Sequence, residues 1–195
     1  MSFVSVLARE SFLCVMSDGQ VTNLDGVTII QEDFQKFTSL MDGRAFIAFA
    51  GTKDLCEMII RDTQLKDRNF SAWKDLFLLV FKALNLTELH KTHNYKVMLA
   101  FGGINESDEI EVYSISSIDK NILHQKPKGD NTDYSFLNNT SHSNEFWEKK
   151  LIELFRETGY NTPSELVSAQ KLLNNFVADN ENSVNKKTFK LVIKK

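Results

Sequence analysis

SFVSVLARESFLCVMSDGQVT, residues 2–22 of the chain, decides how the fold begins. Two β-prone apolar runs, Phe3 to Leu7 and Phe12 to Met16, flank the polar residues Arg9 to Ser11. Apolar runs of this length on either side of a short polar segment are typical of a β-hairpin. The second run leads directly into Ser17-Asp18-Gly19-Gln20, so we expect a carboxylate at the end of the strand that pairs with the N-terminal strand.

The next part of the chain predicts a second hairpin. Two alternating apolar pieces, Val27 to Ile30 and Phe34 to Leu40, precede the turn signal Asp42-Gly43. The run from Arg44 to Ala50 that follows is nearly all apolar, which is typical of a strand covered on both faces. This strand is expected to stop at Gly51.

After Gly51 the hydrophobic period changes from that of strands to that of helices. The spacing predicts a helix from Leu55 to Leu65 and a second helix from Phe70 to Leu89, whose aromatic face would lie in the core or at a subunit contact. Strand character then returns in three runs, Tyr95 to Phe101, Glu109 to Ile115 and Ile122 to Gln125.

The last third of the chain predicts a loop, two helices and a final strand. Residues Asp130 to Ser143 are rich in Asn, Ser, Thr and Asp, so we expect a loop there. One helix is expected from Asn144 to Glu157. A second begins at Thr162-Pro163-Ser164-Glu165, with Thr162 as N-cap and Glu165 completing a capping box, and it is expected to end near Val177. The final strand is expected from Thr188 to Ile193.

The order of elements is therefore strands, two helices, strands, two helices and a strand. Strands that form antiparallel hairpins, with helices that arrive in pairs, favour two packed sheets with a helix pair on each outer face. We predict an α+β fold, a four-layer αββα sandwich. Neither a linker nor an internal repeat interrupts the sequence, so we expect one domain over residues 1–195.

Composition narrows the classes of function. The 195 residues are 42% hydrophobic and 25% charged, with a net charge of -3, which gives no indication of a nucleic-acid or membrane partner. The N-terminus lacks the basic and apolar segments of a signal peptide, so we expect a cytoplasmic protein. Cys14 and Cys56 lie in apolar patterns and are expected to be buried thiols.

Ser2 is the candidate nucleophile. If Met1 is removed, Ser2 carries both a hydroxyl and an α-amine, whose reference pKa of about 7.7–8.0 allows it to act as a general base. A nearby lysine would favour the alkoxide, a carboxylate would hold that lysine, and backbone N–H groups near a glycine would stabilise an oxyanion. Asp18, Lys36 and Gly51 are the candidates for these three roles.

Four short segments also carry a resemblance to a known family. In chain order they are Phe3-Val4-Ser5-Val6, Ser17-Asp18-Gly19-Gln20-Val21-Thr22, Asp33-Phe34-Gln35-Lys36-Phe37 and Ile47-Ala48-Phe49-Ala50-Gly51. Together they resemble the opening of a proteasome β-type subunit, and most of all the bacterial HslV-type peptidase. The segment from Thr158 to Ile193 is similar to the last helix and strand of that family.

The resemblance implies the αββα fold of N-terminal-nucleophile hydrolases, with Asp18, Lys36 and Gly51 in the family's aspartate, lysine and oxyanion-glycine positions. The nucleophile position falls on Ser2 or on Met1, depending on where one residue is inserted in the first hairpin. The glycine-serine-glycine turn of the family is replaced by Ser141-His142-Ser143. The aspartate that the family carries in its last helix would fall near Asn174-Asn175.

Three hypotheses about function follow. The first is a peptidase or amidohydrolase, which by resemblance forms a ring-like homo-oligomer. The second is a catalytically inactive proteasome-like subunit that serves as an assembly or binding module, and the third is a small-molecule amidase. The hydrolytic chemistry needs no cofactor, and the pair His90 and His93 lacks a nearby third ligand for a metal. No sequence feature argues for a particular ATPase partner.

Overall fold

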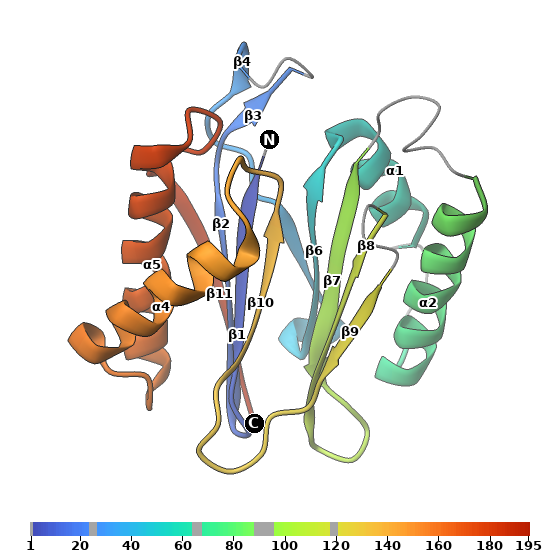
Figure 1. Ribbon diagram of the computed structural model, residues 1–195. Helices are drawn as coiled ribbons and strands as arrows, with labels where there is room; N and C mark the ends of the chain where they lie inside the picture. Colours follow the sequence, from blue (N-terminus) through green and yellow to red (C-terminus); the bar gives the residue numbers. More distant parts are fainter. Residues whose placement is uncertain (1, 24–26, 64–67, 88–95, 118–120) are drawn as a thin grey trace.

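Two β-sheets stack face to face in this protein, with a pair of helices on each outer side (Figure 1). The structure is a computed structural model, and it describes residues 2–23, 27–63, 68–87, 96–117 and 121–195. Its layers run helix pair, sheet, sheet, helix pair. The α+β fold and the four-layer αββα sandwich expected from the order of elements are confirmed.

One sheet contains the N-terminal hairpin. Its strand order is β10 (Asp133–Asn138), β1 (Phe3–Ala8), β2 (Phe12–Asp18) and β11 (Thr188–Lys194). All neighbours in it are antiparallel, and the pairing of β1 with β2 sets Val4 opposite Ser17. The predicted hairpin and the predicted last strand are confirmed.

The other sheet has five strands in chain order, all antiparallel: β5 (Phe37–Leu40), β6 (Ala45–Gly51), β7 (Val97–Ile104), β8 (Ile110–Ser116) and β9 (Ile122–Gln125). A 3-10 turn, Met41–Gly43, joins β5 to β6, which confirms the second hairpin. Strand β7 continues past its predicted end at Phe101 and includes Gly102 and Gly103. A small separate pair consists of β3 (Val21–Thr22) and β4 (Ile29–Gln31).

The helices cover the outer faces in pairs. Helices α1 (Lys53–Thr63) and α2 (Phe70–Thr87) pack on the five-stranded sheet, and α4 (Asn144–Thr158) and α5 (Pro163–Asn180) pack on the four-stranded sheet (Figure 1). The aromatic face of α2 is core, with Trp73 and Phe77 buried beside β7. The predicted helix ends at Leu65 and Leu89 lie outside the described residues.

The start of α5 agrees with the prediction made from the sequence. The Thr162 side chain accepts a hydrogen bond from the Glu165 amide, and the Glu165 carboxylate accepts one from the Thr162 amide, while Pro163 occupies the first helical position. The predicted capping box is therefore confirmed, although the helix runs to Asn180 rather than ending near Val177.

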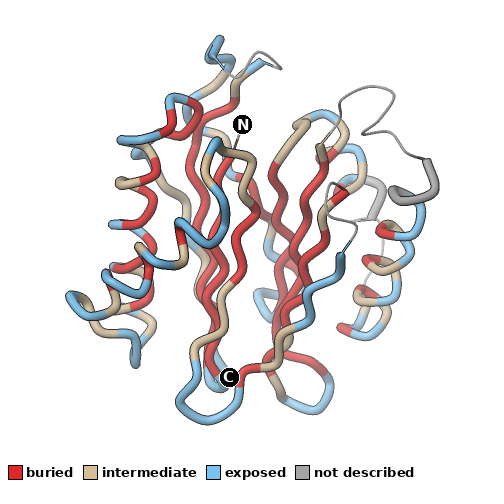
Figure 2. The backbone as a smooth tube through the Cα atoms, in the orientation of Figure 1, coloured by how far each residue is buried: buried red, intermediate tan, exposed pale blue. Residues whose placement is uncertain are grey.

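Aliphatic side chains and a few phenylalanines fill the space between the two sheets, where the backbone is buried almost throughout (Figure 2). Val4 and Val6 of β1 face Phe46 and Ala48 of β6 within this layer. The thiols of Cys14 and Cys56 are buried as expected, and burial raises the pKa of each thiol to about 12. Neither thiol is therefore a nucleophile at neutral pH.

The loop expected over Asp130 to Ser143 is wrong in its central part. Residues Asp133–Asn138 form β10, which pairs with β1 so that Phe3 lies opposite Asn138. Phe136 packs toward α4 and Leu137 packs between the sheets, which is the alternation of a strand. The polar residues around them hid this alternation. Because β10 pairs with β1, it brings the turn that follows it to the N-terminal end of β1.

Within the described residues, no helix is long and apolar enough to cross a membrane.

Candidate functional site

Asp18 occupies the end of β2, next to the start of β1, and is fully buried. Its Oδ1 accepts a hydrogen bond from the Phe3 amide at 2.9 Å, and its Oδ2 accepts one from the Gln20 amide at 2.8 Å. The Lys36 ammonium donates to the same Oδ1. The carboxylate therefore joins the first strand, the turn after β2 and a lysine from a third segment.

Lys36 lies immediately before β5 and is 1% exposed. Its backbone is held by both sheets, because its amide donates to Ser17 Oγ at 3.4 Å and its carbonyl accepts from the Phe49 amide at 2.9 Å. The side chain lies in the interior, where it contacts Asp18. The sequence predicted that Asp18 and Lys36 lie together, and in the structure the two side chains are in contact.

The charges of Asp18 and Lys36 are both buried away from water. Burial lowers the pKa of the Lys36 ammonium, and the charge and hydrogen bond of Asp18 oppose that effect without cancelling it. Desolvation disfavours the charged form of a buried lysine, whereas an opposite charge in contact favours it. Lys36 is thus an ammonium that loses its proton more easily than an exposed lysine does.

Ser2 immediately precedes β1 and is only 6% exposed. The peptide group on its C-terminal side is fixed at both ends, since Ser2 O accepts from the Asn139 amide at 3.1 Å and the Phe3 amide donates to Asp18. Ser2 therefore directly precedes β1, whose first residue is held by the buried Asp18. Met1 lies outside the described residues.

Gly51 ends β6 at the same end of the sandwich where β1 begins (Figure 1). Its φ of +118° lies in a region that favours glycine, and a Cβ there would come within 2.1 Å of the Lys96 carbonyl oxygen. Lys96 also contacts Asn139, because its Nζ donates to Asn139 Oδ1 at 3.2 Å. Gly51 is thereby connected to Ser2 through Lys96 and Asn139, two residues that the sequence analysis did not single out.

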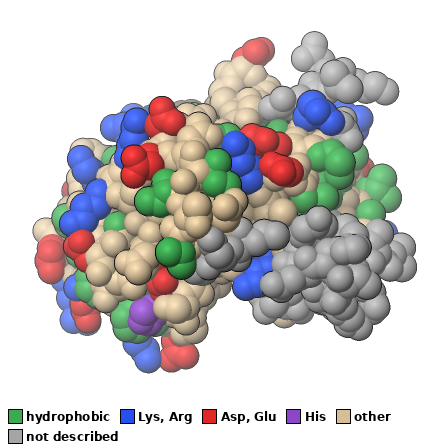
Figure 3. Space-filling view, turned by 90° about the horizontal axis from the view of Figure 1, so that it is seen from above, with side chains coloured by type: hydrophobic (Ala, Val, Ile, Leu, Met, Phe, Trp, Pro, Cys, Tyr) green, Lys and Arg blue, Asp and Glu red, His purple; other side chains and the backbone are tan. Residues whose placement is uncertain are grey.

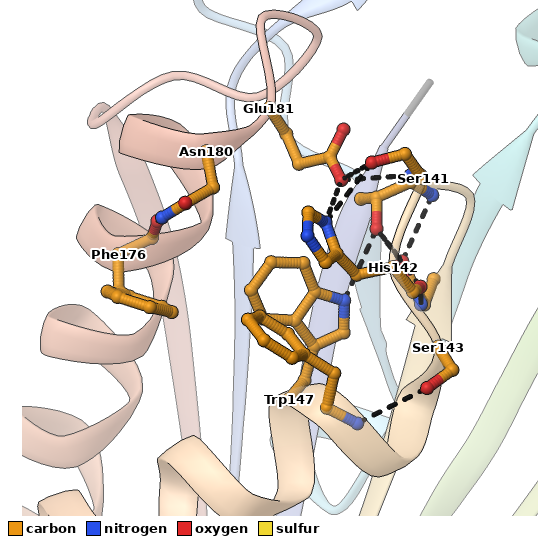
Figure 4. A network of polar contacts seen from close by, with 10 residues as sticks. Ser141, His142, Ser143, Trp147, Phe176, Asn180 and Glu181 are labelled. Carbon is orange, nitrogen blue, oxygen red and sulfur yellow. Dashed lines mark hydrogen bonds and ion pairs between the residues drawn. The ribbon is translucent and has the colours of Figure 1, made fainter.

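The turn Ser141-His142-Ser143 is held by Glu181, a buried carboxylate that follows α5 (Figure 4). Glu181 Oε1 accepts from the Ser141 amide at 2.9 Å, from Ser141 Oγ at 2.5 Å and from His142 Nδ1 at 2.8 Å. Burial acts to raise the pKa of Glu181, but the hydrogen bonds from Ser141 and His142 outweigh it and hold this pKa below its ordinary value.

His142 is part of this fixed turn. Its ring stacks on Phe146 and lies against Trp147, with ring centres 4.5 Å and 5.1 Å apart, and Trp147 Nε1 donates to Thr140 Oγ1 at 3.2 Å (Figure 4). By the sequence resemblance, the position of the family's aspartate falls near Asn174-Asn175, whereas the carboxylate that holds this turn is that of Glu181. Asn174 does form a hydrogen bond, in which its side-chain amide donates to the Asn185 carbonyl at 2.9 Å.

The segment after α5 also fixes the turn that follows Asp18. Asn185 Oδ1 accepts from the Gly19 amide at 3.0 Å, and Gln20 Nε2 donates to the Asn182 carbonyl at 2.7 Å. The polar stretch that leads to β11 therefore supports the Asp18 side of the site as well as the Glu181 side.

A groove of about 630 Å³ runs along the open edge of the sandwich and reaches this turn. Strands β8 and β9 form one wall and β10 forms the other, with Ser114, Leu123, Phe136, Asn138 and His142 among the lining residues. The groove has room for part of an extended ligand. Within the described residues no cluster of His, Cys, Asp and Glu could hold a metal ion, and His90 and His93 lie outside them.

Known proteins resemble this chain in structure but not in sequence. The sequence matches no protein-family model and no curated protein sequence. In structure, the chain is similar to Anbu (ancestral beta-subunit) from Yersinia bercovieri, with a TM-score of 0.70, 12% identity and coverage of 98% of this chain and 82% of that chain. The chain has the fold of Anbu and HslV.

Two further solved structures support this statement. HslV from Trypanosoma brucei superposes with a TM-score of 0.63 at 14% identity, over 99% of each chain. Anbu from Hyphomicrobium sp. strain MC1 superposes with a TM-score of 0.67 at 11% identity, over 98% of this chain and 82% of that chain. The proteasome-like, N-terminal-nucleophile hydrolase fold implied by the sequence resemblance is confirmed over the length of the chain.

Proposed function

We propose that the protein is a proteasome-like N-terminal-nucleophile hydrolase that cleaves peptide or amide bonds, with Ser2 as its nucleophile once Met1 has been removed. The observation that carries this proposal is the buried contact between Asp18 and Lys36, directly beneath the peptide that links Ser2 to Phe3. A buried ion pair contributes little to stability compared with apolar residues of the same volume. A catalytic task explains its position better than a structural one.

The proposed mechanism assigns one step to each of these groups. The Ser2 hydroxyl attacks the substrate carbonyl and gives its proton to its own α-amine, directly or through a water molecule. Lys36 favours the developing alkoxide, and Asp18 orients Lys36. The Gly51 amide stabilises the oxyanion, the amine of the leaving group takes the proton from the α-amine, and a water molecule then hydrolyses the ester on Ser2.

The assembly belongs to the same proposal. A subunit of this fold that cleaves polypeptides would act as a ring-like homo-oligomer that encloses its sites. A monomer that hydrolyses small amides would instead identify a small-molecule amidase. Sedimentation of the purified protein therefore separates these two forms of the hydrolase.

The first experiment measures the intact mass of the protein from its own host, followed by reaction with a β-lactone electrophile that acylates activated hydroxyl groups. We expect loss of Met1 and one acyl group on Ser2, located by peptide mapping. Ser2→Ala should abolish the modification. Ser11→Ala, which removes an exposed hydroxyl in the β1–β2 turn, should leave it unchanged.

Retention of Met1 on all molecules would leave Ser2 without an α-amine, and the proposal would then be wrong. The protein would in that case be an inactive proteasome-like subunit that serves in assembly or binding. A Ser2 that is free but does not react, in protein that is folded by circular dichroism, would lead to the same conclusion.

A further inference from the structure

A second lysine, Lys96, lies in the candidate site and has no part in the proposed mechanism. It immediately precedes β7, and its backbone is bound to the residue after Gly51: the Thr52 amide donates to Lys96 O at 2.8 Å, and the Lys96 amide donates to Thr52 Oγ1 at 3.3 Å. The lysine is thus fixed next to the candidate oxyanion group before its side chain is considered.

The side chain of Lys96 extends from the five-stranded sheet to the four-stranded sheet. Its Nζ donates to Asn139 Oδ1 at 3.2 Å, and the Asn139 amide donates to Ser2 O at 3.1 Å. Gly51, Lys96, Asn139 and Ser2 therefore form a continuous arc. A carbonyl group held between the Ser2 hydroxyl and the Gly51 amide would lie inside this arc, with its flanking groups within reach of a lysine side chain.

Within the part of the chain that the structure describes, the charge of Lys96 is not matched by a carboxylate as that of Lys36 is. The ammonium of Lys36 is buried against Asp18, whereas the partner of Lys96 is a neutral amide oxygen. Among the residues that the structure describes, no carboxylate lies within salt-bridge distance of Lys96 Nζ. Lys96 is also partly exposed.

The wider surface supplies no general attraction for anions. The protein carries a net charge of -3. The end of the sandwich that holds Ser2 shows basic and acidic side chains interspersed on its described surface (Figure 3). A preference for an anionic ligand at this end would therefore come from a single well-placed cation rather than from a basic patch.

We propose that Lys96 is a specificity-determining residue, and that the site prefers substrates with a carboxylate side chain next to the bond to be cleaved. This inference rests on the proposed function of the site. The substrate carboxylate would replace or join the Asn139 amide oxygen as partner of the Lys96 ammonium. A charge-assisted contact of this kind is about twice as strong as a neutral hydrogen bond.

The test measures binding separately from turnover. Fluorescence anisotropy would compare two labelled peptides that differ only in Glu or Gln beside the bond to be cleaved, on Ser2→Ala protein that lacks Met1. We expect the Glu peptide to bind about five- to tenfold more tightly at low salt and to lose this advantage as salt is raised. Lys96→Gln, which keeps a donor for Asn139, should abolish the preference, and Lys96→Glu should reverse it.

Lys53→Met is the matched control. Lys53 is also close to Thr52 in sequence, but its ammonium lies 4.3 Å from the centre of the Phe34 ring and 3.3 Å from Gln31 Oε1. This variant should keep the full preference for the Glu peptide. Thermal unfolding of each variant shows that it is folded before its affinities are compared.

The outcomes separate the two proposals. Equal affinity for the two peptides, no binding of either, or a preference that survives Lys96→Gln would overturn the role of Lys96 and leave the hydrolase proposal standing. A preference that depends on Lys96, in a native protein that cleaves neither peptide, would support the acid-binding site while overturning the hydrolase proposal.

Discussion

Two carboxylates fix segments of the chain in the candidate site, and they do so in different ways. Asp18 is fully buried, is paired with an ammonium, and holds the peptide on the C-terminal side of Ser2. Glu181 is also buried, but its partners are the backbone amide and the hydroxyl of Ser141 and the ring of His142. One carboxylate thus balances a charge, and the other orders a turn.

The two carboxylates therefore have different effects on the groups around them. A buried carboxylate with a lysine changes how easily that lysine loses its proton, which is a property that acid–base catalysis uses. A carboxylate that accepts three hydrogen bonds from one turn fixes the backbone of that turn. We therefore expect the Asp18 side to respond more strongly to loss of its partner than the Glu181 side does.

The largest expected effect follows from removing the ammonium on the Asp18 side. Lys36→Met leaves the Asp18 carboxylate buried without a cation, and breaking a buried pair in this way costs about 3–5 kcal/mol. The cost should fall near the lower figure, because the Phe3 and Gln20 amides still donate to Asp18. Urea unfolding measures the change in the free energy of unfolding.

Two variants sharpen this result. Lys190→Met removes an exposed lysine of β11 and should change the free energy of unfolding by no more than about 0.5 kcal/mol. The double variant Lys36→Met with Asp18→Asn should recover part of the loss, because no buried charge remains. A Lys36→Met protein as stable as the native one would contradict the view that the pair is a buried ion pair.

A smaller effect is expected on the Glu181 side of the site. Glu181→Gln keeps the shape and the acceptor oxygen but turns charge-assisted hydrogen bonds into neutral ones, which should lower the free energy of unfolding by about 1 kcal/mol. The same urea unfolding experiment measures it.

Glu153→Gln is the control for this change, since Glu153 forms an exposed pair with Lys150 on α4 and its loss should be close to neutral. If Glu181→Gln destabilised the protein as much as Lys36→Met does, the contrast between the Asp18 side and the Glu181 side of the site would be lost.

Local sequence signals predicted much of this architecture. The capping box at Thr162 and Glu165 acts within one turn of helix, and the hairpin of β1 and β2 depends on neighbouring segments, so both could be inferred. The order of Asp18 and Lys36 along the chain, together with the family resemblance, predicted that they would meet. The catalytic roles of Ser2, Lys36 and Gly51 remain predictions.

The features that the sequence did not predict depend on partners far along the chain. Strand β10 exists because it pairs with β1, more than 100 residues earlier, and its own polar residues indicate a loop. Glu181 lies in a polar stretch where nothing local distinguishes it from Asp179, and only the fold brings it to the turn at Ser141. Lys96 gains its position from contacts with Thr52 and Asn139 on two other segments.

The smallest expected effect concerns the pH dependence of the Glu181 side. Because the pKa of Glu181 is lower in the folded protein than its ordinary value of 4.5, its contribution to stability is present above that value and is lost as pH falls through the folded pKa. The difference in free energy of unfolding between the native protein and Glu181→Gln should therefore shrink as pH is lowered below about 4.5. Urea unfolding of both proteins between pH 7 and pH 3 would measure it. The Lys36 pair acts at the other end of the pH range, since the lowered pKa of a buried lysine makes the folded state relatively more stable as pH rises toward 10.5. A difference that stayed constant down to pH 3 would mean that the hydrogen bonds to Glu181 do not favour its charged form, and the turn would then be ordered by packing of His142 on Phe146 and Trp147 instead.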